Sequence, residues 1–89
     1  MAKQTLVPRD EDFPEYVVHI ANRNMRMRVV AYGLLSALYG GVPVVATDDK
    51  GGWYAGEADV IAGEPTLLAV NGYGDESTAR RYAESIFVL

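Results

Sequence analysis

Two adjacent carboxylates close an apolar run in the segment GGVPVVATDDKGG, residues 40–52. Neighbouring carboxylates such as Asp48 and Asp49 can hold a hard cation such as Mg²⁺ together with water. Asp, Lys and Gly are also turn residues, and successive side chains on an extended chain point to opposite sides. We therefore interpret residues 42–47 as an interior strand and the following residues as a surface turn, and we expect no metal site.

Two other places in the sequence have residue types that could serve in catalysis or ligand binding. His19 is the one histidine, and no Gly-x-Ser-x-Gly motif accompanies it, so we expect a structural or surface role. NGYGDEST, residues 71–78, has the Gly-x-Gly pattern of a phosphate loop, but Asp75 and Glu76 would repel a phosphate at the helix start. The chain has no cysteine, which excludes thiolate chemistry. We expect no catalytic residue and no cofactor, and therefore no enzyme.

The segment LLSALYGGVPVVATDDKGG, 19 of the 89 residues, resembles part of the C-terminal domain of retaining glycosyltransferases with two Rossmann-like domains. The resemblance implies a helix, a stop of small residues and a buried strand, and it implies binding of a sugar-nucleotide donor by glutamates before that strand. Arg28 and Ser36 stand at the positions that correspond to those glutamates. A nucleotide-sugar or metal-binding enzyme fragment is therefore a minor alternative.

Basic residues gather in one short stretch, where Arg23, Arg26 and Arg28 alternate with Met25 and Met27. On a strand, Arg26 and Arg28 would share one face and could contact phosphates or an acidic protein surface. The net charge of −4 opposes binding to nucleic acid. We therefore favour a solvated face for the arginines and a place in the core for the methionines.

Aromatic and acidic side chains suggest a contact surface. The chain has one tryptophan and six tyrosines, and Trp, Tyr and Arg are enriched at the energetic centres of protein interfaces. We predict a protein-binding surface with three aromatic anchors and an acidic rim that favours a basic partner. The anchors are Trp53, Tyr54 and Tyr73, and the rim is Asp48, Asp49, Glu57 and Asp59.

Size and charge predict a small acidic protein-binding module. By analogy, small acidic proteins from phages and mobile elements inhibit host complexes that handle nucleic acid, and anti-CRISPR proteins are one example. The alternative is a homo-oligomeric assembly protein, because the chain stays apolar to its end at Phe87–Leu89. Gly40, Gly41 and Pro43 interrupt the long uncharged stretch at residues 29–47, so we expect no membrane span. Together with the lack of cysteine, this leads us to expect a cytoplasmic protein.

The elements that must position these residues predict an α+β fold. We expect an irregular N-terminal arm over residues 1–14 and a single compact domain over 15–89. A segment near residues 15–20 comes first, where β-branched residues favour a strand although Phe13, Tyr16, Val17 and Ile20 also have helical spacing. A helix at about 27–39 and the strand at 42–47 come next. One bulged or two short strands at 53–65, a strand at 66–70 and a helix capped by Asp75 follow. The order β-α-β-β-β-α gives a sheet of four to five strands with two helices on one face.

Overall fold

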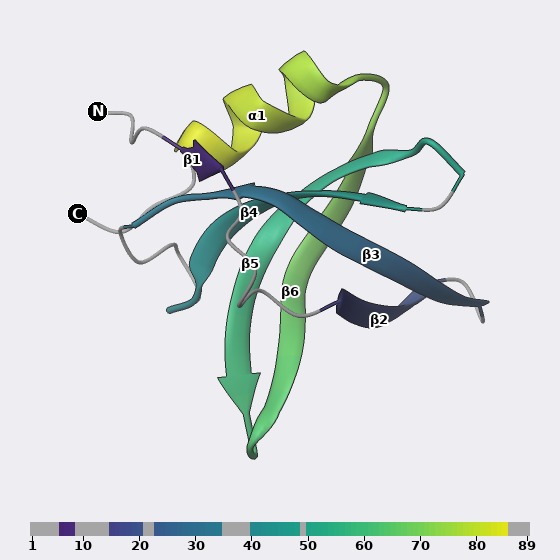
Figure 1. Ribbon diagram of the computed structural model, residues 1–89, viewed down its shortest axis with the longest axis vertical. Helices are drawn as coiled ribbons and strands as arrows, with labels where there is room; N and C mark the ends of the chain where they lie inside the picture. The colour runs from purple at the N-terminus through teal and green to yellow at the C-terminus, as the bar shows by residue number, and fades with distance from the viewer. Residues whose placement is uncertain (1–5, 9–14, 21–22, 35–39, 49, 86–89) are drawn as a thin grey trace.

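The computed structural model describes residues 6–8, 15–20, 23–34, 40–48 and 50–85, and it shows one antiparallel sheet with a helix across one face (Figure 1). The strands are β1 (Val7–Pro8), β2 (Glu15–Ile20), β3 (Arg23–Tyr32), β4 (Val42–Asp48), β5 (Trp53–Ile61) and β6 (Glu64–Tyr73), and the helix is α1 (Glu76–Ser85). Apart from the two-residue β1, five strands of six to ten residues make up the sheet. The predicted α+β class with a single small sheet is confirmed.

The strands follow one another as a meander. The order across the sheet is β1-β3-β4-β5-β6, and β2 also pairs with β3. The register places β2 beside residues 23–28 of β3 and β1 beside residues 31–32, so β1 and β2 pair with different ends of the same strand. The N-terminal residues were predicted to be irregular, but Val7 and Pro8 pair with β3. Leu6, also in that predicted arm, packs against the core, and residues 1–5 and 9–14 lie outside the described part of the chain.

The predicted helix at 27–39 is wrong for residues 27–32, which belong to β3. Helical spacing of Val30 and Leu34 suggested that helix. The structure follows instead the alternation of apolar residues with arginines in the same segment. Met27 and Val29 are fully buried, whereas Arg26 and Arg28 are exposed, which is the pattern of a strand. Residues 35–39 lie outside the described part of the chain, so α1 is the one helix in the described residues.

Helix α1 begins where the sequence predicts. The Asp75 carboxylate accepts a hydrogen bond from the Thr78 amide at 2.8 Å, which is the expected N-cap arrangement. This contact lowers the pKa of Asp75. Glu76 and Arg80 form an ion pair at 2.7 Å on the solvent side of the helix. The NGYGDEST segment is therefore a strand end followed by a capped helix, as expected.

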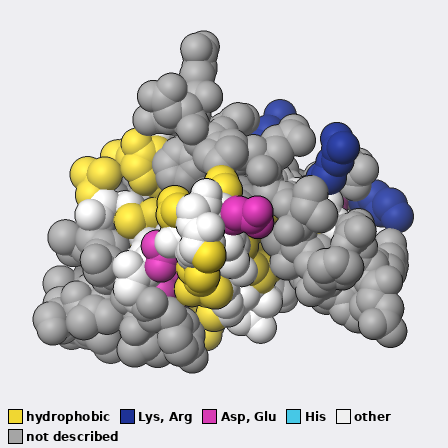
Figure 2. Space-filling view, turned by 90° about the horizontal axis from the view of Figure 1, so that it is seen from below, with side chains coloured by type: hydrophobic (Ala, Val, Ile, Leu, Met, Phe, Trp, Pro, Cys, Tyr) yellow, Lys and Arg dark blue, Asp and Glu magenta, His cyan; other side chains and the backbone are white. Residues whose placement is uncertain are grey.

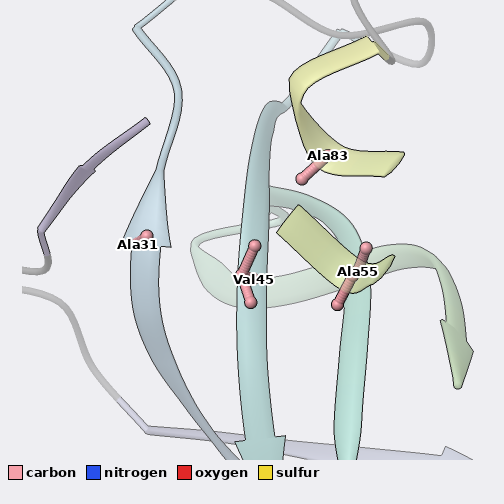
Figure 3. Packing of buried hydrophobic residues seen from close by; sticks show 5 residues of the cluster. Ala31, Val45, Ala55 and Ala83 are labelled. Atoms are coloured by element: carbon pink, nitrogen blue, oxygen red, sulfur yellow. The ribbon is translucent and has the colours of Figure 1, made fainter. Parts of the chain in front are cut away.

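The core beneath α1 is built from small side chains. Ala79 and Ala83 of the helix are fully buried against Ala31, Val45 and Ala55 of the three central strands (Figure 3). Four of these five side chains are alanine, so the helix backbone can approach the sheet closely. Val29, Val44 and Ala58 form a second buried cluster. The predicted burial of Met27 and of the Val-rich strand β4 is confirmed.

Strands β5 and β6 form a long hairpin that extends away from the helix, toward the bottom of Figure 1. Its two-residue turn, Ala62 and Gly63, has positive φ at both positions (53° and 81°), as in a type I′ turn. A bulge interrupts the pairing, since Ala55 faces Asn71 whereas Glu57 faces Leu68. Of the two alternatives predicted for residues 53–65, one bulged strand or two short strands, the structure has one long strand, β5, followed by the turn and the start of β6.

The bulge depends on a glycine opposite it. Ala69 has a φ of 51°, an unusual value for alanine. Two residues of β6, Ala69 and Val70, stand opposite Gly56 alone, so β6 has one extra residue there. A Cβ at Gly56 would lie 2.9 Å from the Leu68 carbonyl oxygen and 3.1 Å from a Val70 methyl group. Gly56 is therefore required by close contact between the two strands.

Candidate protein-contact surfaces

The loop between β4 and β5 is organised by Asp48. Its Oδ1 accepts hydrogen bonds from the amides of Lys50 (2.9 Å) and Gly52 (2.7 Å), and its Oδ2 accepts one from the Tyr54 hydroxyl (2.7 Å). The Thr47 hydroxyl donates to the Gly52 carbonyl oxygen at 2.8 Å and closes the same loop. The carboxylate thus has three donors from its own hairpin, and its role in this structure is to shape the turn.

Electrostatics at Asp48 follow from these contacts. The Tyr54 hydroxyl is the largest cause that lowers the pKa of Asp48, and the Gly52 amide is the next. Partial burial acts in the opposite direction but is smaller. The predicted partner in the acidic pair, Asp49, lies outside the described residues. Among the described residues, no group of three acidic or histidine side chains is placed to hold a metal ion.

The three predicted aromatic anchors are half-buried. Trp53 and Tyr73 pack against the alanine-rich core, and the Tyr73 ring also lies 5.1 Å from the Tyr82 ring, centroid to centroid. Burial, followed by the nearby Tyr82, raises the pKa of Tyr73. Tyr54 is held by Asp48. These rings therefore support the fold, and only part of each reaches the surface.

Glu57 does not belong to an exposed rim. Its side chain is 1% exposed, and its Oε1 accepts a hydrogen bond from the Gly41 amide at 3.2 Å. A Cβ at Gly41 would lie 2.6 Å from the Ala58 carbonyl oxygen, so the chain before β4 passes directly over this part of β5. The prediction of Glu57 as a contact residue is corrected by this burial. Asp59, two residues later, remains partly exposed.

The end of the β5–β6 hairpin exposes large apolar side chains. Val60 is 66% exposed and Ile61 is 46% exposed. The register pairs Val60 with Pro65 and Ile61 with Glu64. Asp59 lies two residues before Ile61, so Asp59, Ile61 and Glu64 share one face of the hairpin, while Val60 and Pro65 share the other. We call these five residues the hairpin tip.

The arginines of β3 form a second exposed surface. Arg26 and Arg28 both point to solvent on the same face of the strand, as predicted. Glu15 of β2 is the cross-strand partner of Arg28 in the register, and its side chain lies outside the described part of the structure. Among the side chains that the structure describes, the one ion pair is Glu76–Arg80, so none involves Arg26 or Arg28. Arg23 belongs to β3 by its backbone. We call Arg26 and Arg28 the arginine row.

Comparison with known proteins finds no match. No family model, no curated protein and no solved structure matches this chain.

The glycosyltransferase resemblance does not extend to the fold. The strand that carries it, β4, is antiparallel to both β3 and β5. A strand of a Rossmann-like domain would be parallel to its neighbours. The shared letters therefore reflect a buried Val-rich strand that ends in a Gly-rich turn.

The hairpin tip was not predicted from the sequence. The one available signal is VIAGEP, residues 60–65, in which two β-branched apolar residues precede a short Gly-containing turn.

In the described part of the chain, no helix is long and apolar enough to cross a bilayer.

Proposed function

We propose that the protein is a small protein-binding module whose contact surface is the hairpin tip. The supporting observation is the exposure of Val60 and Ile61 at the end of a hairpin that extends away from the helix. Complete burial of such a side chain contributes about 1.5–3 kcal/mol, so these two exposed groups could supply a useful part of a binding free energy. Aliphatic groups at the end of a rigid hairpin also lose little entropy on docking.

The charge around the tip supports a basic partner. Residues 51–79 contain no lysine, arginine or histidine, and Asp59 and Glu64 flank Ile61. Figure 2 looks at the molecule from below, toward the end of the hairpin, and shows hydrophobic and acidic side chains together near its centre. The complementary surface on a partner is an apolar pocket with lysine or arginine at its edge. The acidic groups would speed encounter with that surface more than they would increase affinity.

Replacement of the apolar groups tests the proposal. Val60→Thr and Ile61→Thr together keep β-branched side chains on the strand but replace a methyl or ethyl group with hydroxyl. Leu34→Ser is the matched control, because Leu34 is 70% exposed in the connection after β3. Each protein is immobilised, proteins retained from an extract of the source cells are quantified, and each retained protein is then purified and its Kd measured.

The expected result is a partner that binds the wild type and Leu34→Ser with equal affinity. The tip variant should bind it at least about tenfold more weakly, which corresponds to roughly 1.4 kcal/mol. Equal binding by all three folded proteins would contradict the proposal. The narrower role, inhibition of a host complex by a phage or mobile-element protein, stays a prediction, as does the cytoplasmic location.

A further inference from the structure

We propose that the partner of the hairpin tip is a second copy of this chain, which binds the tip through its arginine row. This inference rests on the proposed function, since it names the occupant of the same surface. The arginine row of β3 is exposed, and no ion pair involves Arg26 or Arg28 among the side chains that the structure describes. Glu15, the cross-strand partner of Arg28, is the one acidic residue that the register places beside the row in β2, so the two arginines outnumber it. It is therefore a basic surface of the kind that the acidic tip is suited to contact.

The two surfaces match in spacing. Arg26 and Arg28 are alternate residues of a strand, so they lie about 6.5–7 Å apart along β3. Asp59 pairs with Thr66, which places Glu64 diagonally across the hairpin from Asp59. Such diagonal neighbours are about 7–8 Å apart. Two carboxylates at this separation can face two guanidinium groups at once.

Ile61 supplies the apolar part of the contact. It lies between the two carboxylates in the hairpin register, because Asp59 precedes it by two residues and Glu64 is its cross-strand partner. The aliphatic stems of arginine can cover an apolar side chain while their guanidinium groups bind carboxylates. The arginine row can therefore bind both features of the tip.

One molecule cannot join its own two surfaces. The tip lies at the bottom of Figure 1, whereas the first half of β3 extends to the right. Figure 2 likewise shows Lys and Arg side chains along its right-hand side, away from the acidic and apolar centre. The contact is therefore between copies, and because two different surfaces meet, it can repeat from copy to copy as an open chain.

The net charge of −4 on each copy opposes association at long range. At physiological ionic strength this repulsion is screened beyond about 8 Å, whereas charges in direct contact are screened much less. At moderate salt, the attraction between the carboxylates of the tip and the arginine row can therefore exceed the net repulsion between the two copies.

Charge exchange between the two surfaces tests the inference. One variant carries Arg26→Glu and Arg28→Glu, and the other carries Asp59→Lys and Glu64→Lys. Arg81→Glu is the control for a change of charge on an exposed part of α1. Sedimentation is measured from about 1 μM to about 1 mM, and each variant is first shown to fold by circular dichroism. If either fails to fold, Arg26→Gln with Arg28→Gln and Asp59→Asn with Glu64→Gln replace them. Weaker association of each neutral variant alone is then the test, because neutral side chains cannot restore pairing on mixing.

Wild type and Arg81→Glu should associate as concentration rises, and each double variant alone should associate at least about tenfold more weakly. An equimolar mixture of the two reversed variants should recover association, because each restores the opposite charge for the other. A strictly monomeric wild type would overturn the inference. So would association that is unchanged in the variants, or no recovery on mixing. A monomer that still binds another protein through Val60 and Ile61 would overturn self-docking alone and leave the proposed function standing.

Discussion

Removal of the Asp48 carboxylate should destabilise the protein without disturbing its core. Asp48→Ala leaves three donors without their acceptor: the Lys50 and Gly52 amides and the Tyr54 hydroxyl. Lys50 is exposed, so water can replace its bond at little cost. Gly52 and Tyr54 are half-buried, so loss of their bonds is more costly.

The expected loss follows from these two bonds. Each contributes roughly 1 kcal/mol net, so Asp48→Ala should lower the free energy of unfolding by about 2 kcal/mol. For a domain of this size that corresponds to a fall in Tm of about 8–16 °C. Asp48→Asn keeps one acceptor oxygen and should lose about half as much. Tyr54→Phe removes one bond and should cost about 1 kcal/mol.

Urea and thermal denaturation of the single variants and of the Asp48→Asn, Tyr54→Phe double variant measure these values and their coupling. The pH dependence gives an independent check. The pKa of Asp48 is lower in the folded state, so its stabilisation is fully present above the pKa of the unfolded chain, about 4, and is lost as the pH falls through the folded value. The difference in the free energy of unfolding between wild type and Asp48→Asn should therefore become smaller below about pH 4.

Asp59→Asn is the matched control, because the Asp59 carboxylate accepts a hydrogen bond from the adjacent, exposed Val60 amide, which water can replace. It should leave Tm nearly unchanged. A free energy of unfolding for Asp48→Ala within about 0.3 kcal/mol of the wild-type value, a difference of the size expected from a surface substitution, would contradict the role assigned to Asp48. That role is equally refuted if Asp59→Asn is the more damaging change.

Three further substitutions test other parts of the fold by thermal denaturation. Ala62→Asn should stabilise by about 1 kcal/mol, because asparagine accepts the positive φ of a type I′ turn better than alanine; a lower Tm would contradict the turn assignment. Gly56→Ala should destabilise the protein by about 1–3 kcal/mol, because the new Cβ would contact the Leu68 carbonyl oxygen. Gly72→Ala is the control and should be tolerated, because its Cβ would meet the nearest atom only at 3.4 Å. Equal losses of stability in the two variants would argue against the bulge. Asp75→Ala should lower Tm and Asp75→Asn should largely preserve it, since asparagine also caps helices; equal losses would exclude the cap.

The sequence predicts an element well where its local signals agree. Strand β4 has a Val-rich apolar run, and α1 has Asp75 as its N-cap and an apolar face that includes Ala79 and Ala83. Part of strand β3 was predicted as a helix because Val30 and Leu34 have helical spacing. The competing pattern is the alternation of Met27 and Val29 with arginines, which is typical of a strand. Tertiary burial of those two side chains decides between the two patterns, and no single stretch of sequence contains that information.

The candidate site shows the same limit. Glu57 looked like a surface residue because it is acidic, but its environment is set by the Gly41 amide from a segment 16 positions earlier. Trp53 and Tyr73 were predicted as anchors of a contact surface because of their residue types, yet both pack on the core. The tip of the β5–β6 hairpin was overlooked because exposure of Val60 and Ile61 depends on how far that hairpin extends beyond the sheet.

The meander has a consequence for how the chain acquires its structure. Each of the strands β2 to β5 pairs with the strand that follows it in sequence, so most of the sheet can form by successive short-range closures, which favours rapid folding for a β-rich protein. Helix α1 comes last and covers side chains from β3, β4 and β5. During synthesis, the sheet can therefore assemble before its cover emerges from the ribosome. In that interval Ala31, Val45 and Ala55 would be exposed to solvent, and this apolar surface would be available for a chaperone to bind.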